Sequence, residues 1–223
     1  MLPLYDSLRT HRIPLINWAL IALNGLVFFY ELGLTESGLN GFIETWGLVP
    51  IHLTANAGNL EAWLNVFTAM FIHGGWVHIL SNMWVLFIFG DNVENRMGGT
   101  NYLFFYLLSG VAAALLQAFL LPTSSIPMVG ASGAIAGVLG AYMLLFPQAR
   151  VVSLVPIFFI FTTIELPAVI FLLLWFGIQL LSGFLTMGGA VGSGIAWWAH
   201  IGGFLFGILT VFFFTQRRTI RTW

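Results

Sequence analysis

The sequence contains no cysteine and no lysine, and it is poor in charge of either sign. The lack of cysteine excludes disulfides, thiolate chemistry and cysteine-based metal sites. Only 7% of the 223 residues are charged, against about 25% in a typical soluble domain. A net charge of −1 argues against a nucleic-acid partner. With 59% hydrophobic residues, the composition indicates an integral membrane protein.

Six apolar stretches are long enough to be considered as membrane spans, at residues 13–34, 76–90, 102–121, 132–146, 166–185 and 196–214. The first reads as a retained anchor, because no small-residue cleavage pattern follows it. Residues 63–72 lead into the second stretch and 151–163 into the fifth, and either segment is alternatively interfacial. The expected fold is an all-α, polytopic membrane protein with six transmembrane helices. It forms a single domain over residues 1–223, with short ends at about 1–12 and 215–223.

The basic residues predict the orientation of these spans in the membrane. With six spans and a cytoplasmic N-terminus, every arginine falls on the cytoplasmic side, as the positive-inside rule requires. Both termini are therefore expected to be cytoplasmic. The seven arginines are Arg9, Arg12, Arg96, Arg150, Arg217, Arg218 and Arg221.

Three polar residues lie at one predicted depth in three different spans. Ser132, His200 and His78 are 17 or 18 residues before the arginine that follows each span. At 1.5 Å per helical residue, all three lie roughly 25–27 Å above the cytoplasmic surface. Asn82, one helical turn after His78, shares its helix face. Polar side chains inside a bilayer are costly, so this cluster indicates a functional site.

The residue types in this cluster favour hydrolysis by a serine nucleophile. A serine hydroxyl needs an adjacent base, and His200 is the candidate. Both aspartates, Asp6 and Asp91, are predicted near the cytoplasmic side, so we expect a Ser–His dyad without a third acidic residue. Donors for a developing oxyanion are the Ser132 backbone N–H, the Asn82 amide and the His78 ring N–H.

Small residues predict close packing around the same cluster. A GxxxG pattern occurs in the fourth apolar stretch and another in the sixth, and such patterns let helices approach closely in lipid. Close packing of these two spans would bring Ser132 and His200 within hydrogen-bond reach. The glycines expected to pack near the site are Gly130, Gly133, Gly137, Gly203 and Gly207.

Several motifs together resemble the rhomboid intramembrane serine proteases. The motifs are HILSN at 78–82, GASG at 130–133 and AHxxGxxxG at 199–207. FGDNVENR at 89–96 and GLVP at 47–50 look like prokaryotic members as well. The resemblance runs from about residue 46 to residue 207, with its motifs in the family's order.

The resemblance implies roles for individual residues. Ser132 would be the nucleophile, His200 the base, and His78 and Asn82 the oxyanion donors. The implied activity is cleavage of transmembrane substrate proteins within the lipid bilayer, near the extracytoplasmic face. Substrates would enter past the fifth span, and no metal or organic cofactor is implied. The expected location is a prokaryotic plasma membrane.

One departure from the family concerns position 136. Some members carry an aromatic residue four positions after the serine, where it stacks on the histidine; here it is Ala136. His200 must then be oriented by packing and by a backbone or water contact. The glycine-rich segment 186–194 is expected to form a mobile cap.

Other functions are less consistent with the sequence. No histidine is followed by glutamate, which excludes an HExxH zinc protease, and the two aspartates are misplaced for an aspartyl protease. The main alternative is a noncatalytic rhomboid-like protein that binds client transmembrane helices. A weaker one is a transporter, although we find no convincing inverted repeat.

Overall fold

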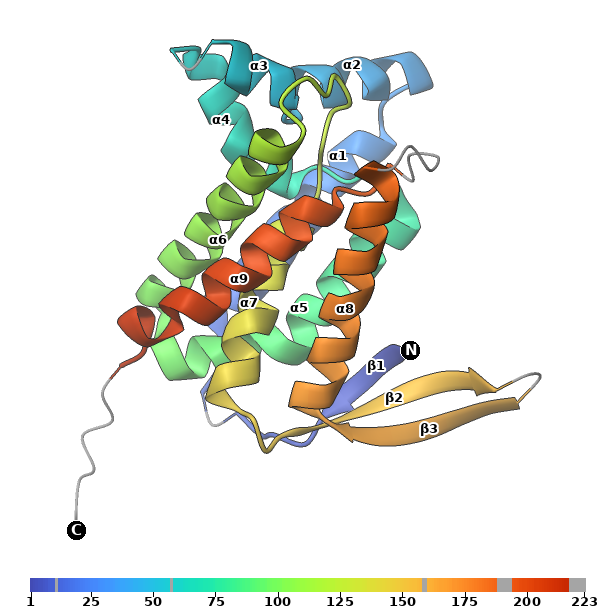
Figure 1. The fold of residues 1–223 in the computed structure, drawn as a ribbon, viewed down its shortest axis with the longest axis vertical. Coiled ribbons are helices and arrows are strands. Elements are labelled where there is room, and N and C mark those ends of the chain that lie inside the picture. Colours follow the sequence, from blue (N-terminus) through green and yellow to red (C-terminus); the bar gives the residue numbers. More distant parts are fainter. Residues whose placement is uncertain (11, 57, 158–159, 188–193, 217–223) are drawn as a thin grey trace.

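The structure is a computed structural model that describes residues 1–10, 12–56, 58–157, 160–187 and 194–216. Six of its helices follow the six predicted apolar stretches, with ends that differ by several residues (Figure 1). The largest difference is in the second, which continues seven residues beyond the predicted end. These helices are α1 (Leu15–Leu32), α5 (Trp76–Met97), α6 (Gly99–Leu120), α7 (Ser132–Leu145), α8 (Ala168–Met187) and α9 (Trp197–Phe214).

The helices confirm a mainly helical membrane protein, but not a count of six crossings. Among the described residues, α1, α6, α8 and α9 are long and apolar enough to cross a membrane. A fifth candidate consists of α4 and η1 joined to α5 across an 80° bend. Helix α7 has only 14 residues and lies inside the bundle, with residues 133–143 all buried. Six crossings therefore remain a prediction.

The prediction of an all-α fold is wrong at one end of the bundle. Strands β1 (Leu2–Asp6), β2 (Arg150–Ile157) and β3 (Ile160–Pro167) form an antiparallel sheet in the order β1-β2-β3. The segment 151–163, expected to lead into the fifth span or lie at the interface, is thus a β-hairpin. Its many valine, isoleucine and threonine residues favour strand conformation. We call this end of the molecule the sheet end (Figure 1).

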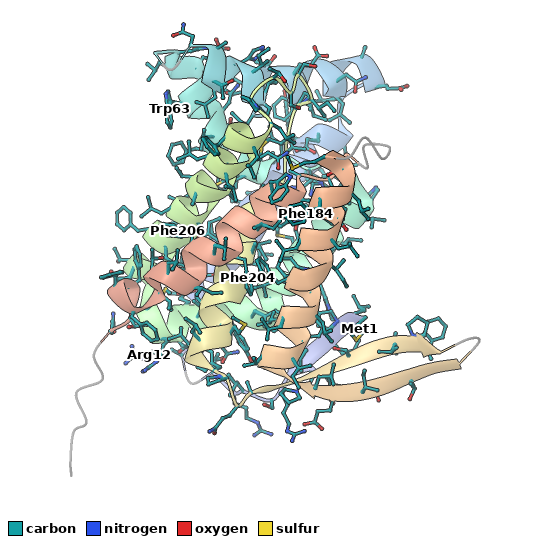
Figure 2. The ribbon with its side chains drawn as sticks, in the orientation of Figure 1. Met1, Arg12, Trp63, Phe184, Phe204 and Phe206 are labelled. Atoms are coloured by element: carbon teal, nitrogen blue, oxygen red, sulfur yellow. The ribbon has the colours of Figure 1, made fainter. Side chains whose placement is uncertain are left out.

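Short helices cover the opposite end, which we call the far end (Figure 1). Thr35 and Asn59 cap two of them by accepting backbone N–H groups of the first turn. These helices are α2 (Glu36–Trp46), α3 (Pro50–Ala55), α4 (Leu60–Thr68) and the 3₁₀ helix η1 (Ala69–Phe71). Figure 2 shows Arg12 at the sheet end and Trp63 at the far end.

A loop from the far end carries the chain into the bundle, where α7 begins (Figure 1). Residues 121–131 form this loop, and backbone hydrogen bonds fix it. Leu48 and Met128 exchange two such bonds, of 3.0 and 2.8 Å, and the Gly130 N–H donates to the Ala69 carbonyl at 2.8 Å. Because these bonds satisfy its backbone, the loop can start a helix below the molecular surface.

Candidate active site

Ser132 and His200 face each other across the contact between α7 and α9. Ser132 is the first residue of α7, and His200 lies in the first turn of α9. The Ser132 Oγ and the His200 Nε2 are 2.8 Å apart. This is hydrogen-bond distance, so the two side chains that the sequence singled out are brought together.

Glycine is required where these two helices touch. A Cβ added to Gly203 would lie 1.9 Å from the Gly133 carbonyl oxygen, and one added to Gly207 would lie 2.1 Å from that of Gly137. Both distances are far below van der Waals contact. The backbones therefore approach as closely as they do only because all side chains are absent at these positions.

His78 and Asn82 lie on one face of α5 and line a cavity with Ser132 and His200. The cavity has a volume of about 710 Å³ and is also lined by Trp76. The His78 Nδ1 accepts the Gly74 N–H at 3.4 Å, which leaves its Nε2 as the N–H donor.

The Asn82 amide is an unpaired donor beside the same cavity. Its Nδ2 is buried and has no hydrogen-bond partner among the residues that the structure describes. Gly130, with φ of 118°, lies against both side chains: a Cβ there would be 2.5 Å from the His78 Nε2 and 3.6 Å from the Asn82 Nδ2. The two hydrogen-bond donors thus lie together beside Gly130, two residues before Ser132 in the sequence. This arrangement is suited to binding a negatively charged oxygen.

A residue that sequence analysis missed holds the far side of the imidazole. The Gln179 Oε1, from α8, lies 2.8 Å from the His200 Nδ1. Gln179 is only 5% exposed. The expectation that a backbone or water contact would orient His200 is therefore replaced by a side-chain contact. The available signal was a lone amide in an otherwise apolar span.

Two tryptophans take the place of the missing aromatic at position 136. The Trp175 ring is tilted by 34° against His200, and the Trp197 ring meets it edge-on at 89°, each with centroids 6.1 Å apart. Ala136 is fully buried and lies under Gly203, where a larger side chain would displace α9. Tryptophans from α8 and α9 thus confine the imidazole.

Comparison with known proteins identifies the family. Residues 60–217 match the rhomboid domain, which is well over half of the chain. The chain belongs to the rhomboid family. Rhomboids are polytopic membrane proteins, and the family includes serine proteases as well as rhomboid-like proteins.

Three similar rhomboids come from different kinds of cell. Rhomboid-like protein 11, chloroplastic, of Arabidopsis thaliana is 34% identical over 51% of this chain and 39% of its own length. Rhomboid protein 1, mitochondrial, of Saccharomyces cerevisiae is 26% identical over 69% and 42%. Rhomboid protease GluP of Bacillus subtilis is 31% identical over 58% and 24%.

These relatives limit which properties can be inferred for this rhomboid from similarity. The chain spans less than half the length of each of the three. Two of the names specify a chloroplast and a mitochondrion, so the expected prokaryotic plasma membrane has no support from them.

The two aspartates lie at the sheet end of this rhomboid, away from Ser132. Asp6, in β1, accepts hydrogen bonds from the Tyr142 hydroxyl and from the Asn92 side chain. Burial raises the pKa of Asp6 above its usual range, which the Tyr142 hydrogen bond partly offsets. Asp91 precedes Asn92 on α5. Neither aspartate lines the cavity at Ser132 and His200, so neither supplies the acidic third residue of a catalytic triad.

Part of the expected site falls outside the described residues. The predicted mobile cap at 186–194 includes residues 188–193, which are not described, and only its ends can be placed. Gly194 lines the cavity at Ser132. Among the described residues, no group of three or more histidine and carboxylate side chains is arranged to hold a metal ion.

Proposed function

We propose that this rhomboid is an intramembrane serine endopeptidase that cleaves transmembrane segments of membrane proteins. The observation that carries the proposal is the 2.8 Å contact between the Ser132 Oγ and the His200 Nε2, beside a cavity into which two further donors converge. The match to the rhomboid domain and the similarity to a rhomboid protease support the same reaction class.

In the proposed reaction, the Ser132 Oγ attacks the carbonyl carbon of a peptide bond while the His200 Nε2 takes the hydroxyl proton. His200 then gives this proton to the leaving nitrogen as the C–N bond breaks, which leaves an ester on Ser132. Water hydrolyses the ester with His200 again acting as base. Each step returns the proton it uses, so the dyad is regenerated.

The charge that develops on the substrate oxygen would be stabilised by three donors. These are the His78 Nε2–H, the Asn82 Nδ2–H and the backbone N–H of Ser132. Donors held in place before the reaction are worth more than water, because they need no reorganisation. The unpaired state of the Asn82 amide supports this role, since a buried donor without a partner is costly unless a ligand satisfies it.

The substrate side chain before the cut bond would be small. A second cavity next to Ser132 has a volume of about 30 Å³ and is bounded by Met70, Ala113 and Gly133, among others. A cavity of about 10–15 Å³ already holds one water molecule, so this second cavity is small. The methyl group of alanine fits it, and glycine needs no such space, whereas an aromatic ring does not fit.

The proposed orientation follows from the arginines and the site together. Arg96 and Arg150 end α5 and begin β2 at the sheet end, and the dyad lies towards the far end. With the sheet end and both termini cytoplasmic, and with α7 as one of six spans, the cavity opens towards the extracytoplasmic side. Substrate would reach it past α8.

The test is labelling with a fluorophosphonate probe, which reacts with activated serines. The parent protein should be labelled, and Ser132→Ala and His200→Ala should not, because one removes the nucleophile and the other its base. Cleavage of a reconstituted transmembrane substrate should follow the same pattern. A folded parent protein that neither reacts nor cleaves would point to the noncatalytic alternative, a binder of client transmembrane helices.

A further inference from the structure

The position of Gln179 carries an inference beyond the dyad. Gln179 is on α8, whereas the two residues of the dyad are on α7 and α9, so a third helix reaches the site. It is the only buried polar side chain that the structure describes on α8. Burying an amide in an apolar span is costly unless both its ends are hydrogen-bonded. The partners of the two ends therefore indicate its role.

Both ends of the Gln179 amide are bonded in a way that fixes its direction. The Nε2 donates to the Trp175 carbonyl at 3.3 Å, and the Oε1 faces the His200 Nδ1 at 2.8 Å. A carbonyl oxygen can only accept. Turning the amide over would set its Oε1 against the Trp175 oxygen, two acceptors facing each other. The Trp175 carbonyl therefore keeps the Gln179 Oε1 directed at the imidazole.

This direction decides which nitrogen of His200 carries the proton. Because the Gln179 Oε1 accepts, the His200 Nδ1 must donate and carries the hydrogen. The Nε2 is then unprotonated and directs its lone pair at the Ser132 hydroxyl, 2.8 Å away. This is the tautomer that a base at Nε2 requires.

A neutral partner suits this location better than a carboxylate. An ionised carboxylate on an apolar helix would be a buried charge. The free-energy cost of its desolvation would offset much of its attraction to the imidazole. An amide oxygen fixes the tautomer and the ring orientation without that cost. It also lends its dipole to the imidazolium that forms when His200 takes the serine proton.

We infer that Gln179 is the positioning residue of this site: it occupies the third place of a triad and holds His200 in the tautomer that activates Ser132. The inference rests on the proposed protease function, although the tautomer itself can be measured without catalysis. Gln179 does not touch the reacting atoms, and it acts through His200.

The experiment compares Gln179→Met, which keeps length and removes the acceptor, with Gln179→Glu, which keeps an oxygen. In the full-length reconstituted protein, Gln179→Met should lower kcat by about tenfold or more and leave KM within about twofold. Gln179→Glu should retain most of the kcat. In ¹⁵N-histidine-labelled protein, His200 should carry its proton on Nδ1 in the parent and on a mixture of both nitrogens in Gln179→Met.

The matched control is Gln117→Met, the same change at another buried amide. The Gln117 Oε1, on α6, accepts the Ala199 N–H at 3.1 Å, so this variant removes a hydrogen bond to α9 without touching the imidazole. It should leave the His200 tautomer unchanged. If it lowers kcat as much as Gln179→Met does, lost helix packing explains both losses and the inference is wrong.

The remaining outcomes separate this inference from the proposed function. An active parent whose kcat and tautomer survive Gln179→Met would overturn the role of Gln179 alone. A parent that never cleaves or reacts with the probe would overturn the protease function, and its ¹⁵N spectrum would still report the tautomer. If Gln179→Met does not fold, a parent spectrum with the proton on Nε2 overturns the inference, and one with the proton on Nδ1 supports it.

Discussion

At the residue scale, the candidate site includes a buried polar group, the Asn82 Nδ2, whose part in function differs from its part in stability. A buried donor is usually paired, because an unpaired one costs about 1–3 kcal/mol. Among the residues that the structure describes, the Asn82 Nδ2 beside the dyad has no hydrogen-bond partner. Stability and function therefore make different demands on this residue, and a substitution should separate them.

Replacing Asn82 by alanine should lower activity without lowering stability. Loss of one oxyanion donor typically reduces kcat by about 10²–10³. Since the Nδ2 has no partner to lose in the described part of the chain, the unfolding temperature in detergent should stay the same or rise slightly. Cleavage rates and thermal unfolding of Asn82→Ala would be measured together. A folded variant with the parent's kcat would show that this amide stabilises no oxyanion.

At the element scale, the contact between α7 and α9 sets the geometry of the dyad. Ser132 and His200 lie at the N-terminal ends of these two helices, so any separation of the helices moves both side chains. Behind them, Phe204 on α9 stacks on Phe176 of α8, with ring centroids 4.6 Å apart. The glycines permit the close approach of α7 and α9, and the aromatic stack holds α8 against α9.

A single methyl group at this contact should damage both stability and activity. Gly203→Ala places its Cβ 1.9 Å from the Gly133 carbonyl oxygen, so α9 must shift. Overpacking of this kind costs about 1–3 kcal/mol, and a shift of the base relative to Ser132 lowers kcat. The control is Gly25→Ala on α1, whose Cβ would meet nothing within 4 Å. Equal unfolding temperatures for the two variants would contradict the packing argument.

Also at this scale, a buried carboxylate holds the segment that leads into α5. Glu31, on α1, is 2% exposed and accepts the backbone N–H of His73 at 3.1 and 3.3 Å. His73 lies three residues before the start of α5, the helix that presents His78 and Asn82. This contact ties the position of the oxyanion donors to α1.

At the scale of the whole molecule, the two ends of the bundle differ in chemistry as well as in structure. The sheet end carries Arg9, Arg12, Arg96 and Arg150, and the far end carries the helices around Trp46 and Trp63. Arginines gathered at one end are typical of a protein with a fixed orientation, because arginines stay on the cytoplasmic side, whereas tryptophans occur at both interfaces.

The absence of cysteine makes this orientation directly measurable. Ser7, after β1 at the sheet end, and Ser37, in α2 at the far end, are both exposed. In intact cells, a membrane-impermeant maleimide should label Ser37→Cys but not Ser7→Cys, and permeabilisation should expose both. The parent protein, which has no cysteine, is the unlabelled control. The reverse pattern would invert the proposed topology.

The sequence by itself indicated the six long helices and the candidate residues of the dyad. Helical hydrogen bonds and apolar runs are local, so the positions of Ser132, His200, His78 and Asn82 at the starts of apolar segments could be inferred without coordinates. The common depth predicted for Ser132, His200 and His78 followed from residue counting alone.

Only the tertiary structure decided the sheet and the third member of the site. Strand β1 pairs with β2 from about 150 residues away, as in the pairing of Leu2 with Leu154, and no local pattern specifies such a partner. Gln179 lies 21 residues from His200 in the sequence, on another helix. It meets the imidazole only because α8 and α9 pack with these two faces turned towards each other. Hydrogen bonds between separate elements depend on how those elements pack, which local sequence does not contain.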